Sequence, residues 1–311
     1  MFNKKHLLSI ESLSTSEIND ILNLAEKYVN LNRKKKKHLD LLKGLTQINM
    51  FFENSTRTRM SFELAQRRLS ADSINFSAPS SSLKKGESLK DTIQNIEAMK
   101  IDAIVMRHPH AGSPKLLTNF VNAIIINAGD GTHEHPTQAI LDLMSLYEKF
   151  GKIKGLNIGI IGDVTHSRVA RSNIFGLITM GAKVTICGPP NLVPKFTDGL
   201  NIKVNHSVDD VIDWADAIIV LRIQKERMGQ SLIPSIREYR SMFGITKERL
   251  RIHKKEIVIM HPGPINRGIE IDSIVADSDQ AIILDQVLNG VASRMAILFL
   301  LCGKKQNLDK E

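Results

Sequence analysis

Residues 51–63 read Phe-Phe-Glu-Asn-Ser-Thr-Arg-Thr-Arg-Met-Ser-Phe-Glu, and the periodicity of the chain changes inside this stretch. The apolar run 48–52 predicts a strand, whereas the apolar spacing from Met60 to Leu69 predicts a helix. A polar loop of hydroxyl and arginine side chains lies between them. Because the first turn of a helix has unpaired N–H groups and the positive end of the helix dipole, this junction favours an anion such as phosphate.

The side chains of this loop add further donors for an anion. They are Ser55, Thr56, Arg57 and Thr58. The alternative interpretation is an ordinary helix start, in which Ser55 caps the helix and Arg59 pairs with Glu63 one turn on. Two arginines at alternate positions beside three hydroxyl groups exceed what capping needs, so the anion site is favoured, although Arg59 can still have the structural role.

The chain has 311 residues, of which 42% are hydrophobic and 5% aromatic, as is typical of a globular α/β enzyme. This length favours two domains. The formal net charge of +9 leaves a nucleic-acid-binding protein as an alternative. The largest basic run, 33–37, follows a predicted helix and has no aromatic neighbours for base stacking, so a solvated loop is favoured and nucleic acid is not the expected partner. Part of the excess charge fits a site for polyanionic small molecules.

Neither a disulfide nor a membrane segment is expected. Cys187 and Cys302 stand alone in apolar contexts, which is typical of small core residues and fits no metal or disulfide framework. Residues 1–9 lack a long apolar core, and no run approaches the roughly 18 residues of a membrane span. We therefore expect a cytoplasmic protein with no membrane partner.

Apolar, β-branched segments recur along the chain, and helical patterns lie between most of them. These segments are 46–52, 102–106, 123–127, 156–162, 183–187, 217–221, 257–261 and 280–284. Strands that alternate with helices predict an α/β fold in which each parallel sheet is flanked by helices. Such sheets bind ligands at the C-terminal ends of their strands, so functional side chains should follow strands.

A break in the pattern predicts the domain boundary. Residues 151–155 read Gly-Lys-Ile-Lys-Gly and follow a predicted helix at 136–150, after which a new strand begins. We expect one domain at 1–150 and a second, Rossmann-like domain at 151–284. The apolar final helix is expected to pack back on the first domain, which 285–311 would then complete.

Two histidines, a proline and a glutamine follow a predicted strand. The stretch 127–138 reads Asn-Ala-Gly-Asp-Gly-Thr-His-Glu-His-Pro-Thr-Gln and carries His135 and Gln138 into a helix that begins at Pro136. His133 and His135 raise the alternative of a zinc site. No cysteine or third histidine has the spacing of a structural site, so no metal is expected.

Other polar segments are ambiguous by themselves. The loop 81–88, Ser-Ser-Leu-Lys-Lys-Gly-Glu-Ser, is typical of a mobile surface loop before a helix. Gly159 and Gly162 match a dinucleotide-binding turn only weakly. Arg168 and Arg222 each follow a predicted strand, and together they could grip a dicarboxylate, although either one alone fits a surface ion pair.

Several motifs, taken in order, point to one family. They are Ser-Thr-Arg-Thr-Arg at 55–59, Lys-Lys-Gly-Glu at 84–87, Met-Arg-His-Pro at 106–109, His-Pro-Thr-Gln at 135–138, Arg-Ile-Gln-Lys-Glu-Arg at 222–227 and His-Pro-Gly-Pro at 261–264. With them the chain resembles the catalytic chains of aspartate carbamoyltransferases over nearly its whole length. Ornithine enzymes typically carry His-Cys-Leu-Pro and a Ser-Met-Gly loop, and this chain has neither. A sibling enzyme with another acceptor remains the alternative.

The resemblance implies transfer of the carbamoyl group of carbamoyl phosphate to L-aspartate, giving N-carbamoyl-L-aspartate for pyrimidine biosynthesis, with no cofactor. It implies that the phosphate is held by Ser55, Thr56, Arg57 and Thr58. Arg107 would bridge the phosphate and the carbonyl oxygen, which His135 and Thr58 would polarise. The carbamoyl amide would be held by Gln138 and by the backbone carbonyls of Gly263 and Pro264. The aspartate carboxylates would be bound by Arg168, Arg222 and Gln224.

The resemblance also implies an assembly. Ser81 and Lys85 resemble loop residues that reach into a neighbouring subunit's site, Ser81 toward carbamoyl phosphate and Lys85 toward aspartate and the reaction. A homotrimer with shared active sites follows from this. Ser82 remains an alternative to Ser81, and regulatory chains in a larger assembly are compatible with the sequence.

The chemistry of this reaction agrees with the donors in the motifs. Attack of the aspartate amine on the carbamoyl carbon builds negative charge on the carbonyl oxygen and then on the leaving phosphate. Fixed donors at both places lower the barrier without a metal or a covalent intermediate. No general base is obvious among the motif residues, and our hypothesis is that the leaving phosphate takes the amine proton.

Overall fold

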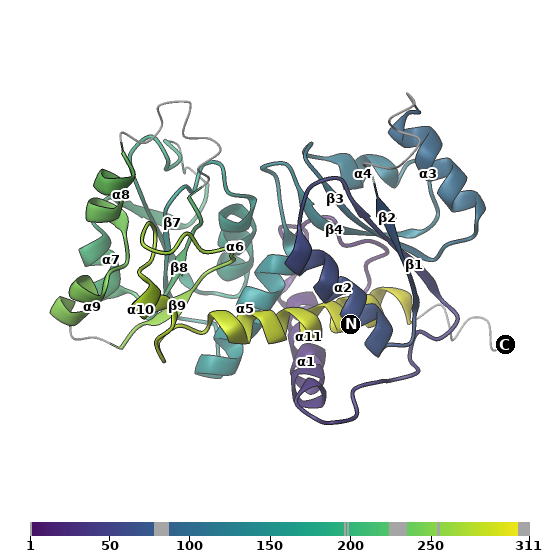
Figure 1. Ribbon diagram of the computed structural model, residues 1–311, viewed down its shortest axis with the longest axis horizontal. Coiled ribbons are helices and arrows are strands. Elements are labelled where there is room, and N and C mark those ends of the chain that lie inside the picture. Colours follow the sequence, from purple (N-terminus) through teal and green to yellow (C-terminus); the bar gives the residue numbers. More distant parts are fainter. Residues whose placement is uncertain are drawn as a thin grey trace. The chain divides into compact units, whose positions relative to one another are not determined.

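The computed structural model describes residues 2–77, 87–195, 197, 199–223, 235–253 and 256–303 (Figure 1). The chain divides into two compact units. Unit 1 contains the residues up to Met144 and those from Leu288 onward, and unit 2 is Ser145–Val287. Each unit has one parallel sheet flanked by helices, so the predicted α/β class with two such sheets is confirmed.

The sheet of unit 1 has the strand order β2-β1-β3-β4. Its strands are β1 (Thr46–Phe51), β2 (Asp72–Ser77), β3 (Ala103–His108) and β4 (Ile124–Asp130). β1 and β4 are buried almost throughout, as expected for a parallel sheet that is covered on both faces. The helices of the unit are α1 (Thr15–Asn32), α2 (Thr56–Arg68), α3 (Leu89–Ala98), α4 (Ser113–Leu117), the first part of α5 (Pro136–Phe150) and most of α11 (Ile283–Cys302).

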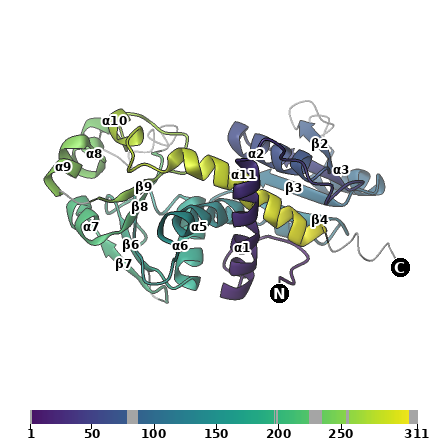
Figure 2. The same ribbon diagram turned by 90° about the horizontal axis from the view of Figure 1, so that it is seen from below.

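The sheet of unit 2 has the order β7-β6-β5-β8-β9, which is the Rossmann arrangement 3-2-1-4-5 when its strands are counted along the chain. Its strands are β5 (Asn157–Ile161), β6 (Lys183–Cys187), β7 (Ile202–Asn205), β8 (Ala217–Val220) and β9 (Val258–Met260). Its helices include α6 (Arg168–Thr179), α7 (Val208–Trp214), α8 (Ile236–Phe243), α9 (Lys247–His253) and α10 (Ser273–Ala276). They flank the sheet within the unit (Figure 2).

The strand pattern departs from expectation in a few places. The strands β2 and β7 were not predicted, and both lie at a sheet edge. Polar residues alternate with apolar ones in them, so neither forms the continuous apolar run by which the other strands were predicted. The predicted strand at 280–284 is wrong. Ala281 forms only an isolated bridge with Ile259, and α11 begins at Ile283, because a short apolar run cannot be told from a buried helix by periodicity.

Helix α11 corrects the expectation that no segment approaches a membrane span. Ile283–Cys302 is long and apolar enough to cross a membrane by length and composition, with a mean hydropathy of 1.4 in its most apolar window, but 67% of that window is buried inside the protein. Asn289, Ser293 and Arg294 are buried along it. Polar and charged side chains are costly in a lipid-facing helix, so these features favour a core helix.

Cys187 and Cys302 are buried and do not form a disulfide with each other, as predicted for small core residues. Burial raises the pKa of the Cys187 thiol to about 12, with weaker contributions from nearby charges. The basic run 33–37 is mostly exposed immediately after α1, as predicted for a solvated loop.

Candidate functional site

The strand order of unit 1 reverses between β1 and β3, because the chain places β2 on one side of β1 and β3 on the other. Ligands of open α/β sheets bind at such a switch point, beyond the C-terminal ends of the strands. Phe51 is paired with Arg107, and the backbone N–H of Phe52 donates to the Arg107 carbonyl at 2.9 Å. The predicted anion loop after β1 and the predicted arginine of β3 therefore lie side by side.

Ser55 occupies the N-cap position of α2, but its side chain accepts no hydrogen bond from the helix. Serines cap other helices with their side chains: Ser14, Ser88, Ser167, Ser207 and Ser235. The alternative interpretation of Ser55 as a side-chain cap is therefore wrong. The Ser55 hydroxyl does not bond the first N–H groups of α2, which is the arrangement that suits an anion site.

The structural role considered for Arg59 is also wrong. Glu63 accepts hydrogen bonds from Arg67 at 2.7 Å and from Asn75 at 3.1 Å, so its carboxylate is occupied by other partners. Arg59 is exposed, and its side chain is not paired with Glu63.

The predicted phosphate ligands differ in exposure. Thr58 is buried, Ser55 is half-buried, and Thr56 and Arg57 are exposed. Desolvation lowers the pKa of the Arg57 guanidinium, and the carboxylate of Asp142 opposes this shift. Arg107 is mostly buried and forms an ion pair with Glu53, with 3.1 Å between Nε and Oε2. Arg57 and Arg107 place positive charge beyond the C-terminal edge of the sheet, beside the neutral hydroxyl donors.

A polar network holds the loop between β4 and α5. Asp130 Oδ1 accepts from the Asn127 side chain at 2.7 Å and from the Glu134 backbone at 3.2 Å. The Glu134 carboxylate in turn accepts from Ser9 Oγ at 2.6 Å and from the Ile10 N–H at 2.9 Å. These residues are buried or half-buried, so their bonds fix the backbone that leads to the next helix.

His135 and Gln138 follow this loop. Both are buried, at 3% and 6% exposure, at the start of α5, where Pro136 is the first helical residue, as predicted. His133 pairs with Asp130 at 3.1 Å. Among the described residues, no group of three or more histidine, cysteine or acidic side chains is gathered as a metal site.

Sequence reasoning missed Arg294 and Asp142. Arg294 on α11 is fully enclosed, and its Nη1 donates to Ser61 Oγ and to the Gly290 carbonyl, each at 2.9 Å. Burial lowers the pKa of Arg294 to about 9; Arg57 and Arg107 add to this shift, and Asp142 opposes it. A signal was available, because Arg294 and Asp142 each interrupt an apolar helical stretch.

Unit 2 has a corresponding switch point between β5 and β8. Arg168 begins the helix after β5, and Arg222 lies two residues after the end of β8; both are half-buried. The Asn266 side chain donates to the Ile223 carbonyl at 2.7 Å and so ties the loop after β9 to the segment after β8. The unit thus brings the predicted aspartate ligands Arg168 and Arg222 to the same edge of its sheet.

The loop after β9 contains Gly263 and Pro264, which are joined by a cis peptide bond. The φ of Gly263 is 59°, a left-handed conformation that suits glycine. His261 is buried; its Nδ1 accepts from the Gly263 N–H at 2.7 Å, and its Nε2 lies 3.2 Å from Glu270 Oε1. These contacts fix the backbone at the predicted carbamoyl-binding positions.

Some predicted site residues cannot be placed. Ser81, its alternative Ser82, Lys85 and Gln224 lie outside the described residues.

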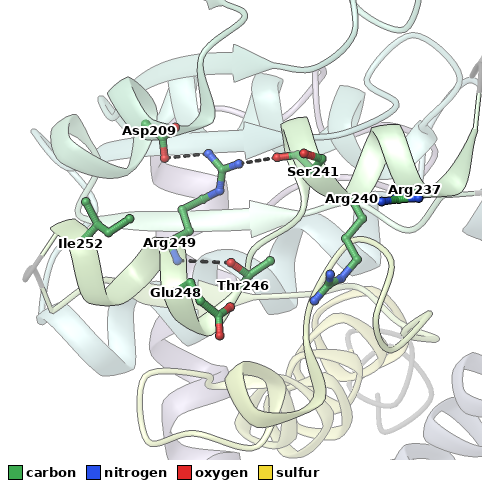
Figure 3. A pocket seen from close by; sticks show the side chains of 8 residues that line it. All are labelled: Asp209, Arg237, Arg240, Ser241, Thr246, Glu248, Arg249 and Ile252. Carbon is green, nitrogen blue, oxygen red and sulfur yellow. Dashed lines mark hydrogen bonds and ion pairs between the residues drawn. The ribbon is translucent and has the colours of Figure 1, made fainter.

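Unit 2 also has an open hollow of about 490 Å³ that contains arginines from α8 and α9 (Figure 3). Arg249 donates to Asp209 at 2.6 Å, and Arg240 donates to Asp272 at 2.8 Å, so both guanidinium groups are already paired. None of the predicted site residues lines this hollow. We therefore do not assign it to the reaction.

Family models match both halves of the chain. The aspartate/ornithine carbamoyltransferase, carbamoyl-P binding domain matches residues 5–148, and the Asp/Orn binding domain of the same family matches residues 154–301. A relative from Cytophaga hutchinsonii, an aspartate carbamoyltransferase catalytic subunit, is 55% identical over 301 residues, which cover 97% of this chain and 98% of the relative.

Solved structures show the same fold. Aspartate transcarbamoylase from Trypanosoma cruzi, in complex with carbamoyl aspartate and phosphate, is 31% identical with a TM-score of 0.88, and the match covers 96% of this chain and 97% of that one. Ornithine carbamoyltransferase from Pyrococcus furiosus is 28% identical with a TM-score of 0.84, and the match covers 96% and 97% of the two chains. The fold alone therefore does not distinguish the acceptors, whereas the higher sequence identity is with the aspartate enzyme.

Proposed function

The chain belongs to the aspartate/ornithine carbamoyltransferase family, and on this premise we propose that it transfers the carbamoyl group of carbamoyl phosphate to the amine of L-aspartate. The products are N-carbamoyl-L-aspartate and phosphate, and the reaction is a step of pyrimidine biosynthesis. The observation that carries the proposal is the switch point of unit 1, where the uncapped start of α2 meets Arg107 of β3.

We assign the phosphate of carbamoyl phosphate to this junction. The ligands are Ser55, Thr56, Arg57, Thr58 and Arg107, with Ser81 from the loop outside the described residues. The backbone N–H groups of the first turn and the guanidinium groups supply charge-assisted hydrogen bonds to phosphate oxygens. Arg57, Arg107 and the enclosed Arg294 outnumber the carboxylates of Glu53 and Asp142, so a bound anion balances the charge.

The carbonyl oxygen of the carbamoyl group is assigned to His135, Thr58 and Arg107. Negative charge develops on this oxygen when the amine attacks, so donors fixed beforehand stabilise the transition state more than the ground state. The carbamoyl amide is assigned to Gln138 and to the backbone carbonyls of Gly263 and Pro264. Two observations support donors and acceptors that are fixed before the reaction. His135 is buried, and the loop before α5 and the loop after β9 are each held by hydrogen bonds within their own unit.

We assign the carboxylates of L-aspartate to unit 2. Arg168 and Arg222 both follow strands at its switch point, and a guanidinium group matches the geometry of a carboxylate. Gln224 and Lys85, which lie outside the described residues, complete the proposed set. The domain roles follow: residues 1–150 with 285–311 bind carbamoyl phosphate, and 151–284 bind aspartate.

In the proposed reaction the amine nitrogen forms a bond to the carbamoyl carbon and the bond to the phosphate oxygen breaks. The electron pair of that bond leaves with the phosphate, which also takes the proton that the amine loses. No metal or cofactor is required for this step, because the charges that develop are met by the arginine, histidine and backbone donors.

A panel of acceptors tests the assignment of aspartate. We expect phosphate release from carbamoyl phosphate to depend on L-aspartate and to be at least about 10³-fold slower with L-ornithine, because arginines bind a carboxylate and repel an ammonium group. Phosphate is measured colorimetrically, with carbamoyl phosphate alone as the blank. Faster turnover with L-ornithine than with L-aspartate would assign a different acceptor.

We further propose a cytoplasmic homotrimer in which Ser81 and Lys85 complete a neighbouring subunit's site; regulatory chains remain compatible with this arrangement. Mixing two inactive variants, Lys85→Ala and Arg57→Ala, after mild dissociation tests it. Hybrid trimers would contain some sites with both halves intact, so activity should reappear, with the trimer mass confirmed by sedimentation. If the mixture stays inactive while wild-type chains treated in the same way recover, the sites are not shared.

A further inference from the structure

Asp142 lies one turn after Gln138 on α5, and the two side chains are bonded to each other. Gln138 Nε2 donates to Asp142 Oδ1 at 3.0 Å, and the two residues are 6% and 0% exposed. A carboxylate only accepts hydrogen bonds, so it can pair with the NH₂ end of the amide and not with the oxygen end. The orientation of the Gln138 amide is therefore set by Asp142.

This orientation decides what Gln138 offers to a ligand. One N–H of Nε2 is bonded to Asp142; the amide keeps its second N–H and its carbonyl oxygen Oε1, and Oε1 is the atom of this side chain that accepts hydrogen bonds. Among the described residues, Gln138 makes no other side-chain hydrogen bond. An acceptor at this place binds the N–H groups of a carbamoyl amide and gains nothing from a methyl group or from a second carbonyl oxygen.

We propose that Asp142 is a positioning residue that selects the carbamoyl group by holding the Gln138 amide with its oxygen toward the substrate. The inference rests on the proposed function, because it concerns how carbamoyl phosphate is told from an acyl phosphate of the same shape. Acetyl phosphate is the relevant comparison, since a methyl group replaces the NH₂ group and the phosphate is unchanged.

Neighbouring positive charges favour the carboxylate form of Asp142, which is the form that only accepts hydrogen bonds. The guanidinium groups of Arg57 and Arg294 both interact electrostatically with its carboxylate, and neighbouring cations favour the charged form of a carboxyl group. Gly290 leaves room for this arrangement, because a Cβ there would lie 2.7 Å from Arg294 Nη1. The same carboxylate thus offsets part of the positive charge around the phosphate loop.

Asp142 orients the Gln138 amide, which favours carbamoyl phosphate, and its negative charge weakens the binding of any anion. Because the two effects act in opposite directions on ligand affinity, one substitution can separate them. Asp142→Asn keeps the shape and allows the new amide to donate to Gln138 Oε1, so the orientation of Gln138 is no longer fixed. We expect the preference for carbamoyl phosphate over acetyl phosphate to fall by about tenfold or more. The affinity for inorganic phosphate should be unchanged or higher, because a negative charge has been removed beside the arginines.

The preference is measured as the ratio of the acetyl phosphate inhibition constant to the carbamoyl phosphate KM in the phosphate-release assay. Inorganic phosphate is titrated calorimetrically, and the melting temperature checks folding. Glu148→Gln removes a carboxylate from an exposed position of the same helix and should leave the ratio unchanged. The double variant Asp142→Asn with Gln138→Glu restores an acceptor at position 138 while the new amide at position 142 donates to it, so it should recover much of the preference.

Equal losses for all three ligands in Asp142→Asn would mean that Asp142 only supports the fold, and an unchanged ratio would overturn the inference. Failure of the proposed function is distinguishable, because a wild-type protein that releases no phosphate with L-aspartate would fail before any variant is compared.

Discussion

The β1–α2 junction of unit 1 and the β5–α6 junction of unit 2 have the same place in their sheets but different chemistry. Each follows a strand at a switch point, and each helix has a serine at its N-cap. The Ser167 hydroxyl accepts a hydrogen bond from the Ala170 N–H at 3.1 Å and so caps the N-terminus of α6, whereas the Ser55 side chain makes no such bond. A parallel strand followed by a helix thus determines where a ligand can bind. Whether a serine side chain caps that helix determines whether backbone N–H groups remain available to an anion.

The arginines follow the same division. In unit 1, Arg57 and Arg107 lie beside the uncapped helix start, as suits a phosphate with many acceptor oxygens. In unit 2, Arg168 begins a helix that its own serine already caps, so binding there depends on guanidinium side chains. A carboxylate is matched by such side chains without help from the backbone.

The largest effect should come from Arg57→Ala, which removes charge at the unit 1 junction. We expect kcat/KM for carbamoyl phosphate to fall about 10³-fold, because the guanidinium group meets charge that grows as phosphate leaves. Phosphate release at saturating L-aspartate measures this. Arg67→Ala serves as the control on the same helix, since Arg67 forms an exposed ion pair with Glu63, and it should stay within about twofold of wild type.

A smaller loss is expected for His135→Ala. If His135 donates to the carbonyl oxygen in the transition state, kcat should fall about 10²-fold, while the dissociation constant of carbamoyl phosphate changes little. Steady-state kinetics and calorimetric titration separate the two quantities. Unchanged turnover would remove His135 from its assigned role.

Arg168→Ala sharpens the comparison from the side of unit 2. The KM for L-aspartate should rise roughly tenfold to a hundredfold, because a bidentate carboxylate contact is lost. The affinity for carbamoyl phosphate should stay the same, in contrast to Arg57→Ala. An equal loss of carbamoyl phosphate affinity in both variants would mean that the two junctions do not divide the substrates in this way.

The smallest effect concerns stability and tests the caps themselves. Ser167→Ala should lower the free energy of unfolding by about 1 kcal/mol, because it removes a side-chain cap. Ser55→Ala should cost no more than a few tenths of a kcal/mol, yet it should weaken carbamoyl phosphate binding. Urea denaturation of the two variants provides the comparison, and equal destabilisation would show that Ser55 is an ordinary cap.

Much of this division was predictable from the sequence. The change of period after Phe52 locates the strand, the loop and the helix of the first junction. The order of motifs places Arg107 at the end of a strand and His135 and Arg168 after strands. The edge strands were not predictable by the same means. Asp72–Ser77 is the edge strand of its sheet and alternates polar with apolar residues, so it does not read as a buried apolar run.

The surroundings of the candidate site depend on contacts that sequence spacing does not contain. Arg294 donates to Ser61, which lies 233 positions earlier in the chain, and its electrostatic neighbours come from other elements. Likewise, the sequence does not show that Ser55 stands at an N-cap position without making a side-chain cap bond. Ser167 and Ser55 are the same residue type and are equally good capping residues. Burial and hydrogen-bond partners, which only the fold determines, separate these cases.

A crystal structure of the protein with bound inorganic phosphate tests the central claim most directly. We predict phosphate at the start of α2, with backbone N–H groups of residues 55–58 and the Arg57 and Arg107 guanidinium groups at hydrogen-bond distances of about 2.7–3.1 Å. Phosphate bound at the start of α6, beside Ser167 and Arg168, with the α2 junction left without it, would contradict the account.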